Sequence, residues 1–137
     1  MKAKLRLSSF GLVALIVPLW GHHAFSAEYD STKPVTIKGK FLKMDWINPH
    51  SWVYIEVTGD GGKVATWKAE ALPPNGLYRQ GWRRDSLKVG EEISIDGYLA
   101  KDGSTTMWSR SVTTSDGRKM FAGNADSAPG APAAAKQ

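Results

Sequence analysis

The sequence of 137 residues contains no cysteine. This absence excludes disulfide scaffolds, thiolate metal sites, covalent haem attachment and cysteine nucleophiles. The chain also lacks the repeated long apolar runs of a polytopic membrane protein, and its mean hydropathy is −0.33. It shows no internal repeat and no glycine-rich phosphate loop. Aromatic residues are plentiful, with six Trp, four Tyr and four Phe. This content excludes a fully disordered protein. The length suits a single domain.

The N-terminus has the three parts of a secretory signal. Basic side chains stand at Lys2, Lys4 and Arg6, and an apolar stretch follows over residues 10–20. This stretch is short for crossing about 30 Å of hydrocarbon, and polar residues follow it at once, so a retained membrane helix is the weaker alternative. Gly21 is the best residue for the position before the cut, although Leu19 stands where a small residue is usual. We therefore expect a signal peptide over residues 1–21 and no stable membrane insertion after its removal.

Removal of the signal leaves a nearly neutral protein. Three of the 18 basic residues belong to the signal, so 15 face the 13 acidic ones and the net charge becomes about +2. This charge is too small for the basic patch of a nucleic-acid-binding protein, and we expect no nucleic acid partner. At the other end, the Ala/Pro-rich residues 122–137 include no large apolar side chain and are expected to form a disordered tail. A polar lead-in over residues 22–33 leaves residues 34–121 as the folded domain.

Residues 34–121 alternate apolar and polar side chains in short stretches separated by glycine-containing turns, which is typical of β-strands. In the first stretch the apolar positions change phase after Phe41, which indicates a β-bulge or a sharp coil. A short helix, capped by Asn75 and carrying Leu77, Tyr78 and Trp82, is expected between the third and fourth strands. The pattern predicts strands near residues 35–46, 51–57, 64–71, 91–100 and 106–114, and a short one at 118–121.

This order of elements predicts the fold. Three strands, a short helix and two further strands follow the order of an OB-fold barrel. The bent first strand favours the barrel because that strand must serve both halves of a small closed sheet. We therefore predict an all-β protein, namely a small five-to-six-stranded OB-like barrel with one short helix between strands three and four. An open β-sandwich is the alternative, but it leaves the helix unexplained.

Several short motifs resemble those of a known family. They include Gly21-His22-His23-Ala24-Phe25, Trp46-Ile47-Asn48-Pro49-His50-Ser51-Trp52 and Gly81-Trp82-Arg83-Arg84-Asp85. Through them the chain resembles a family of small secreted bacterial proteins to which no activity is assigned. The resemblance spans nearly all of the expected mature domain. It implies a periplasmic location and no particular chemistry.

The three histidines are the main candidates for metal binding. His22 and His23 begin the expected mature chain, and His50 lies in the loop between the first two strands, at the rim of the usual OB ligand face. Imidazoles suit copper, zinc and nickel, and a chain without cysteine offers them nitrogen and oxygen donors. A cut before His22 frees an amine that could complete a three-nitrogen Cu(II) site with His50. A cut before Gly21 places a histidine third, where deprotonated backbone amides can wrap Cu(II) or Ni(II). Glu28 is a further candidate ligand.

The alternative for these histidines is structural, since His50 could simply hydrogen-bond the backbone of a tight loop. A second set of candidate residues is aromatic and basic. Trp52 and Tyr54 share one face of the second strand, and Arg83 and Arg84 lie near the short helix. Such a surface could dock an envelope protein or a small anionic ligand without a metal. Ordinary packing is the alternative explanation for the aromatic side chains.

The sequence shows no catalytic constellation. The carboxylates of Asp45, Glu56 and Glu70 lie on different strands, and no Ser-His-Asp order is present. We therefore expect a non-enzymatic periplasmic binding protein. The first hypothesis is binding of a transition metal, copper above others, and the second is the metal-independent interaction module. A third, an oligonucleotide-binding barrel, predicts an affinity that falls steeply with salt.

Overall fold

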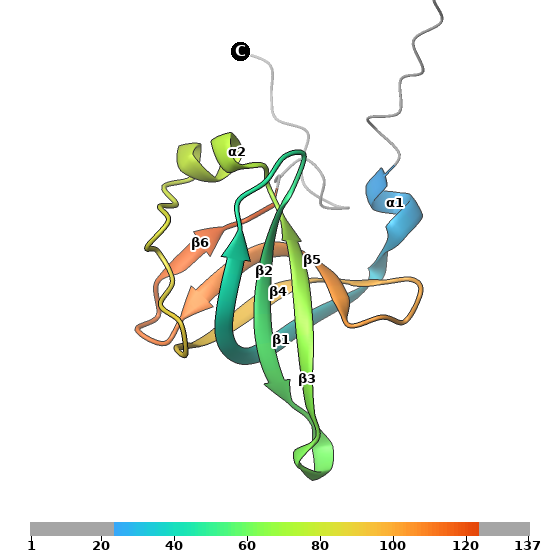
Figure 1. The fold of residues 1–137 in the computed structure, drawn as a ribbon. Coiled ribbons are helices and arrows are strands. Elements are labelled where there is room, and N and C mark those ends of the chain that lie inside the picture. The colour runs from blue at the N-terminus through green and yellow to red at the C-terminus, as the bar shows by residue number, and fades with distance from the viewer. Residues whose placement is uncertain (1–23, 124–137) are drawn as a thin grey trace, which may run out of the picture.

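The computed structural model describes residues 24–123 of the chain (Figure 1). The expected signal peptide, His22, His23 and residues 124–137 of the expected tail lie outside this range. None of the helices within residues 24–123 is long and apolar enough to span a membrane. The elements follow in the order α1 (Ala24–Glu28), β1 (Tyr29–Asp45), β2 (Ser51–Thr58), a 3-10 turn η1 (Asp60–Gly62), β3 (Val64–Ala71), α2 (Pro74–Arg79), β4 (Glu92–Ala100), β5 (Thr106–Thr114) and β6 (Lys119–Phe121).

Strands β1 to β5 close into a small barrel (Figure 1). β1 pairs antiparallel with both β2 and β4, while β2 pairs with β3 and β4 pairs with β5 in the same sense. A short parallel pairing of β3 with β5, centred on Ala69 and Met107, closes the ring. β6 extends the far end of β5. The parallel closure and the helix between β3 and β4 confirm the predicted OB-like barrel.

β1 bends where the change of phase predicts it. Its register with β2 shifts between Phe41 and Lys43, so that Leu42 forms a bulge. Before the bend β1 pairs with β4, and after it with β2; Lys40 has partners on both strands. A Cβ at Gly39 would lie 2.4 Å from the backbone oxygen of Glu56, so a residue without a side chain is needed where the strands cross.

The barrel interior is filled by inward-facing aliphatic side chains, together with residues beside α2. Val53, Ile55 and Ile95 are fully buried, and the side chains of Leu77 and Trp82 complete the core. The indole nitrogen of Trp82 donates a hydrogen bond to the backbone oxygen of Phe121 at 2.7 Å. The helix differs in detail from the expectation. It begins at Pro74 rather than being capped by Asn75, and it ends before Trp82 because Gly81 adopts a φ of +90°.

Within the expected polar lead-in, Phe25 and Tyr29 pack against the outside of the barrel. Phe25 in α1 lies 5.0 Å from the ring of Trp108 and 5.8 Å from the rings of both Tyr29 and Tyr98, measured between centroids. Tyr29, Tyr98 and Trp108 are buried, and we call the four residues together the outer aromatic cluster. At the C-terminal end, Ala122 and Gly123 are also buried, so these first two residues of the expected disordered tail 122–137 belong to the folded domain. Both donate backbone hydrogen bonds to the oxygen of Arg110.

Candidate functional site

Of the three histidines predicted to bind a metal, His50 lies within residues 24–123. It ends the β1–β2 loop directly before Ser51, the first residue of β2. Its side chain is 44% exposed, and its Nδ1 contacts the Oε1 atom of Glu70 on β3. Its Nε2 accepts and donates no hydrogen bond within residues 24–123. One ring nitrogen is thus held by the protein, and the other is available.

The Glu70 carboxylate is buried between two donors. Only 7% of the residue is exposed, because Tyr29 covers it and its neighbours in register are Trp52 on β2 and Trp108 on β5. The hydroxyl of Tyr29 donates to Oε2, while His50 occupies Oε1. A buried carboxylate is costly unless its oxygens are paired, and these two contacts supply the pairing. Tyr29, Glu70 and His50 therefore form one hydrogen-bonded chain, which we call the Tyr29–Glu70–His50 chain.

The Tyr29 hydroxyl is a permanent donor in this chain. Burial raises the pKa of Tyr29 far above its usual value, and the hydrogen bond and charge of Glu70 raise it further. The phenol therefore keeps its proton at any physiological pH. Because a protonated phenol donates to Oε2, Glu70 is fixed in position on that side and can hold the His50 ring on the other.

The remaining predicted metal ligands are not assembled around His50 within the described residues. His22 and His23 lie outside residues 24–123. Within that range no group of three His, Asp or Glu side chains is arranged to hold a metal ion. Glu28, the further candidate ligand, ends α1 and lines a groove beside Tyr29.

The predicted aromatic pair lies on the outer face of β2. Trp52 and Tyr54 point away from the core, as the alternation with Val53 and Ile55 predicts. A lysine ammonium group lies over each ring. The Lys68 ammonium is 5.0 Å from the ring centroid of Trp52, and the Lys43 ammonium is 4.3 Å from the ring centroid of Tyr54. Burial raises the pKa of the Tyr54 hydroxyl, and the nearby Asp45 carboxylate raises it further.

Arg83 and Arg84 contact a different pair of aromatic side chains. The Arg84 guanidinium lies 5.6 Å from the ring of Trp46, and that of Arg83 lies 5.9 Å from the ring of Tyr78. Trp46 and Tyr78 stack with their centroids 5.3 Å apart. Arg83 also donates to the backbone oxygen of Trp82 at 2.6 Å. The basic residues therefore belong to the end of the barrel near α2. Nothing in the sequence pattern indicates that Trp46 and Tyr78 are their partners.

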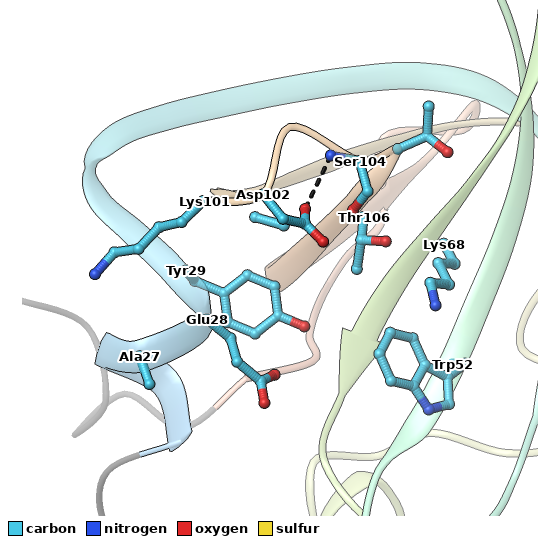
Figure 2. A pocket seen from close by; sticks show the side chains of 11 residues that line it. Ala27, Glu28, Tyr29, Trp52, Lys68, Lys101, Asp102, Ser104 and Thr106 are labelled. Atoms are coloured by element: carbon cyan, nitrogen blue, oxygen red, sulfur yellow. Dashed lines mark hydrogen bonds between the residues drawn. The ribbon is translucent and has the colours of Figure 1, made fainter.

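A groove opens on the outer surface beside the Tyr29–Glu70–His50 chain (Figure 2). Its volume is about 750 Å³. Three parts of the chain line it: Glu28 and Tyr29 where α1 meets β1, Trp52 and Lys68 on β2 and β3, and Lys101 and Asp102 in the β4–β5 turn. The faces of strands two and three and the turn between strands four and five are the parts with which OB-folds usually bind ligands. The groove therefore coincides with the usual ligand face of this fold.

The sequence reasoning did not find Tyr29 and Glu70 as parts of the site. Tyr29 fell in the expected lead-in, whose alternation gives no sign that its ring is buried. Glu70 follows the strand pattern and faces outward beside Trp52, so the pattern marks it as solvated. The register of the β2–β3 hairpin is the one feature that points to Glu70. It follows the core residue Ala69 and stands directly across from Trp52 on β2.

A comparison with models of protein families shows the family of the chain. Residues 11–109 match the model of the family described as Family of unknown function (DUF6152). This match covers more than half of the sequence, so the chain belongs to that family and the resemblance expected from its motifs is confirmed. A search of curated proteins finds no match. Membership of the family assigns no chemistry to His50 or to any other residue.

Proposed function

We propose that this protein is an exported, non-enzymatic periplasmic protein that binds a transition metal, with copper preferred, through His50 and the terminal pair His22 and His23. The observation that carries the proposal is the contact between His50 Nδ1 and the buried Glu70 carboxylate. Metal-binding histidines commonly donate their second ring nitrogen to a carboxylate, which fixes the tautomer and makes the metal-binding nitrogen more basic. In this protein that nitrogen is the available Nε2.

Tyr29 adds a further layer of support. A carboxylate can orient a histidine only if the carboxylate itself is held, and the Tyr29 hydroxyl holds the second oxygen of Glu70. Such outer hydrogen bonds tune the affinity of a ligand without touching the metal. The histidine sits in a loop, but its orientation is set by two side chains on the barrel strands.

The anchoring of α1 supports a role for the terminal pair. Phe25 packs into the outer aromatic cluster, and Tyr29 at the start of β1 bonds the same Glu70 that holds His50. In the sequence, His22 and His23 directly precede α1, which packs on the side of the barrel that carries Glu70. Nitrogen donors of this kind favour copper over the other divalent first-row ions.

Copper titration of the mature protein tests this proposal. The protein is expressed with its own signal, and its native mass reports both the cut site and any bound metal. Isothermal titration calorimetry and electron paramagnetic resonance then compare His50→Ala with the loop control Asn48→Ala. We expect His50→Ala to weaken Cu(II) binding at least about tenfold and to remove one nitrogen from the spectrum, while the control binds as the parent does. Equal affinity in both variants would falsify the assignment of His50.

The exposed aromatic and basic surfaces favour a second candidate function, a metal-independent interaction module. Trp52 and Tyr54 under lysines, and Trp46 and Tyr78 under Arg84 and Arg83, offer aromatic rings and cations together. This combination suits an acidic protein partner or a small anion. Cross-linking in envelope extracts, followed by mass spectrometry, tests it. A partner lost in Trp52→Ala or in the double variant Arg83→Gln/Arg84→Gln, and retained with a chelator, supports the module over the metal protein.

A further inference from the structure

The groove beside α1 has charged groups of both signs on its walls. Glu28 and Asp102 supply two carboxylates, and Lys68 and Lys101 supply two ammonium groups. Figure 2 shows Glu28 and Lys68 reaching the groove from opposite sides, from α1 and from β3 next to Trp52. The formal charges of these four side chains cancel. A polyanion such as a nucleic acid would meet two carboxylates here, and a polycation would meet two ammonium groups.

Two of the four charges are already engaged by the protein. Lys101 Nζ donates to the backbone oxygen of Ser26, and this contact ties the β4–β5 turn to α1. Asp102 Oδ1 accepts from the backbone nitrogen of Ser104 at 2.9 Å. Hydrogen bonds from Ser104 lower the pKa of Asp102, with a smaller contribution from Lys68, so this carboxylate is charged at neutral pH. These contacts build the wall of the groove and leave its remaining charges for a ligand.

Glu28 and Lys68 are the charges that remain. Among residues 24–123 the Glu28 carboxylate has neither a hydrogen bond nor an ion pair, and the Lys68 ammonium contacts the Trp52 ring without pairing with a carboxylate. Opposite charges that line one groove without pairing with each other can each receive a charge from outside. Ala27, Ala100 and Trp52 supply apolar parts of the groove wall.

We propose that this groove binds a zwitterion, a short peptide of two or three residues with both ends free. The peptide's α-ammonium lies toward Glu28, and its carboxylate lies toward Lys68. Two or three extended residues span about 7–10 Å, a length that a groove of this size accommodates. The peptide backbone packs along Trp52, and the hydroxyls of Ser104 and Thr106 lie at the same wall.

The zwitterion site does not depend on the proposed metal function. His50 does not line the groove, although Tyr29 belongs to both places because its hydroxyl bonds Glu70 and its ring forms part of the wall. Peptide binding is therefore expected to be the same in His50→Ala and in the presence of a chelator. Loss of copper binding and loss of peptide binding are separate results, and either can occur without the other.

Titration with trialanine and its end-blocked forms tests the proposal. Affinities for trialanine, N-acetyl-trialanine, trialanine amide and the neutral disaccharide maltose are measured by calorimetry and by NMR shifts of the Trp52 indole. Trialanine is expected to bind at micromolar to millimolar concentration, and blocking either end is expected to weaken binding about tenfold. Maltose binding as strong as trialanine binding, equal binding of the blocked peptides, or no binding of trialanine at millimolar concentration overturns the proposal.

Variants assign the two ends of the peptide. Lys68→Met and Glu28→Gln are each expected to weaken trialanine binding about tenfold. In Lys68→Met the amide is expected to bind as trialanine does, and in Glu28→Gln most of the penalty of acetylation disappears, because each charge has lost its partner. Lys43→Met and Glu56→Gln are matched controls: Lys43 covers Tyr54 as Lys68 covers Trp52, and Glu56 lies on the same outer face of β2. A loss of affinity in the controls equal to that in the groove variants contradicts the assignment.

Discussion

The barrel interior and the outer aromatic cluster are two hydrophobic regions of one small domain, and they are built differently. The interior collects aliphatic side chains that alternate along the strands, so closing the barrel buries them all at once. The outer cluster collects aromatic rings from α1, β1, β4 and β5, and it is buried only because α1 and Tyr29 fold over the strands. The first region is a property of the sheet, and the second depends on a segment that docks on it.

The two regions also treat polar groups differently. Around the interior, the described side chains are apolar apart from residues such as Ser51, whose hydroxyl has no hydrogen-bond partner within residues 24–123. The outer cluster lies against a buried carboxylate, Glu70, which contacts Tyr29 from within the cluster and His50 from the loop. A buried carboxylate placed in the region that depends on a docked segment points to a role beyond stability, since apolar residues would hold such a place at lower cost.

The largest effect is expected in the interior. Replacing Ile95 by alanine removes a fully buried side chain from the middle of β4 and leaves a cavity that a closed barrel relaxes only in part. The free energy of unfolding is expected to fall by about 2–5 kcal/mol. Urea denaturation followed by tryptophan fluorescence measures it, with the exposed Val64→Ala as the control. A loss as small as that of the control would show that the interior is not close-packed.

The next effect belongs to the Tyr29–Glu70–His50 chain. Tyr29→Phe keeps the ring in the outer cluster and leaves one Glu70 oxygen without its donor, so the free energy of unfolding is expected to fall by about 1–3 kcal/mol. Tyr78→Phe at the exposed end of the barrel is the control. Because the outer cluster is buried only by a docked segment, Tyr29→Phe is expected to lose less free energy of unfolding than Ile95→Ala. A loss larger than that would make the outer region the main source of stability.

The same tyrosine predicts a dependence on alkaline pH. Its pKa is raised in the folded protein, so its contribution is complete below the unfolded pKa of about 10 and is lost as pH rises above it, when the unfolded state releases its proton first. The slope is about 1.4 kcal/mol per pH unit. Between neutral pH and pH 11, the free energy of unfolding is therefore expected to fall more steeply for the parent than for Tyr29→Phe. Identical slopes would mean that the phenol ionises freely.

A smaller and more local effect is expected at α1. Phe25→Ala removes the ring that joins α1 to Trp108 and Tyr98, at a cost of roughly 1–2 kcal/mol. Hydrogen exchange followed by mass spectrometry is expected to show faster exchange over residues 24–33 and unchanged exchange in β2 and β3. Faster exchange throughout the barrel would show that the two regions unfold as one.

The sequence is informative about the first region and nearly silent about the second. Strand alternation places Val53 and Ile55 inside and Trp52 and Tyr54 outside, and the change of phase after Phe41 marks the bend that lets β1 serve both halves of the barrel. These are local consequences of a period of two. The order of strands and helix then leaves few closed topologies, so the OB-like barrel could be predicted.

The site could be predicted only in part, because its key contacts depend on tertiary docking. His50 was identified from its loop position and its chemistry. The burial of Glu70 requires Tyr29 to lie across β3, and residues 29 and 70 are far apart in the sequence. The sequence suggests one docking surface of Trp52, Arg83 and Arg84, whereas the structure places the two arginines over Tyr78 and Trp46 near α2. No periodicity reports where a helix docks.

The smallest effect is expected at a third place on the outer surface, where a carboxylate is bonded as Glu70 is but remains partly in water. Burial alone would raise the pKa of Asp96, but hydrogen bonds from Thr36, Lys119 and Ser111 outweigh burial and lower it. Its contribution is therefore present above the unfolded pKa of about 4 and is lost as pH falls below that value. Solvent screening limits Asp96→Asn to less than about 1 kcal/mol at neutral pH.

Urea denaturation at neutral pH and at pH 3 measures this term, with Asp60→Asn in the solvent-exposed β2–β3 turn as the control. The deficit of Asp96→Asn relative to the parent is expected to shrink at the lower pH, because the unfolded parent then carries a proton on this carboxylate while the folded form, whose pKa is lower, resists taking one up. A deficit that matches that of Tyr29→Phe would sink the idea that burial sets the weight of a polar contact on this surface. Because both carboxylates accept side-chain hydrogen bonds and differ mainly in exposure, the pair isolates what the docking of α1 and Tyr29 adds at Glu70.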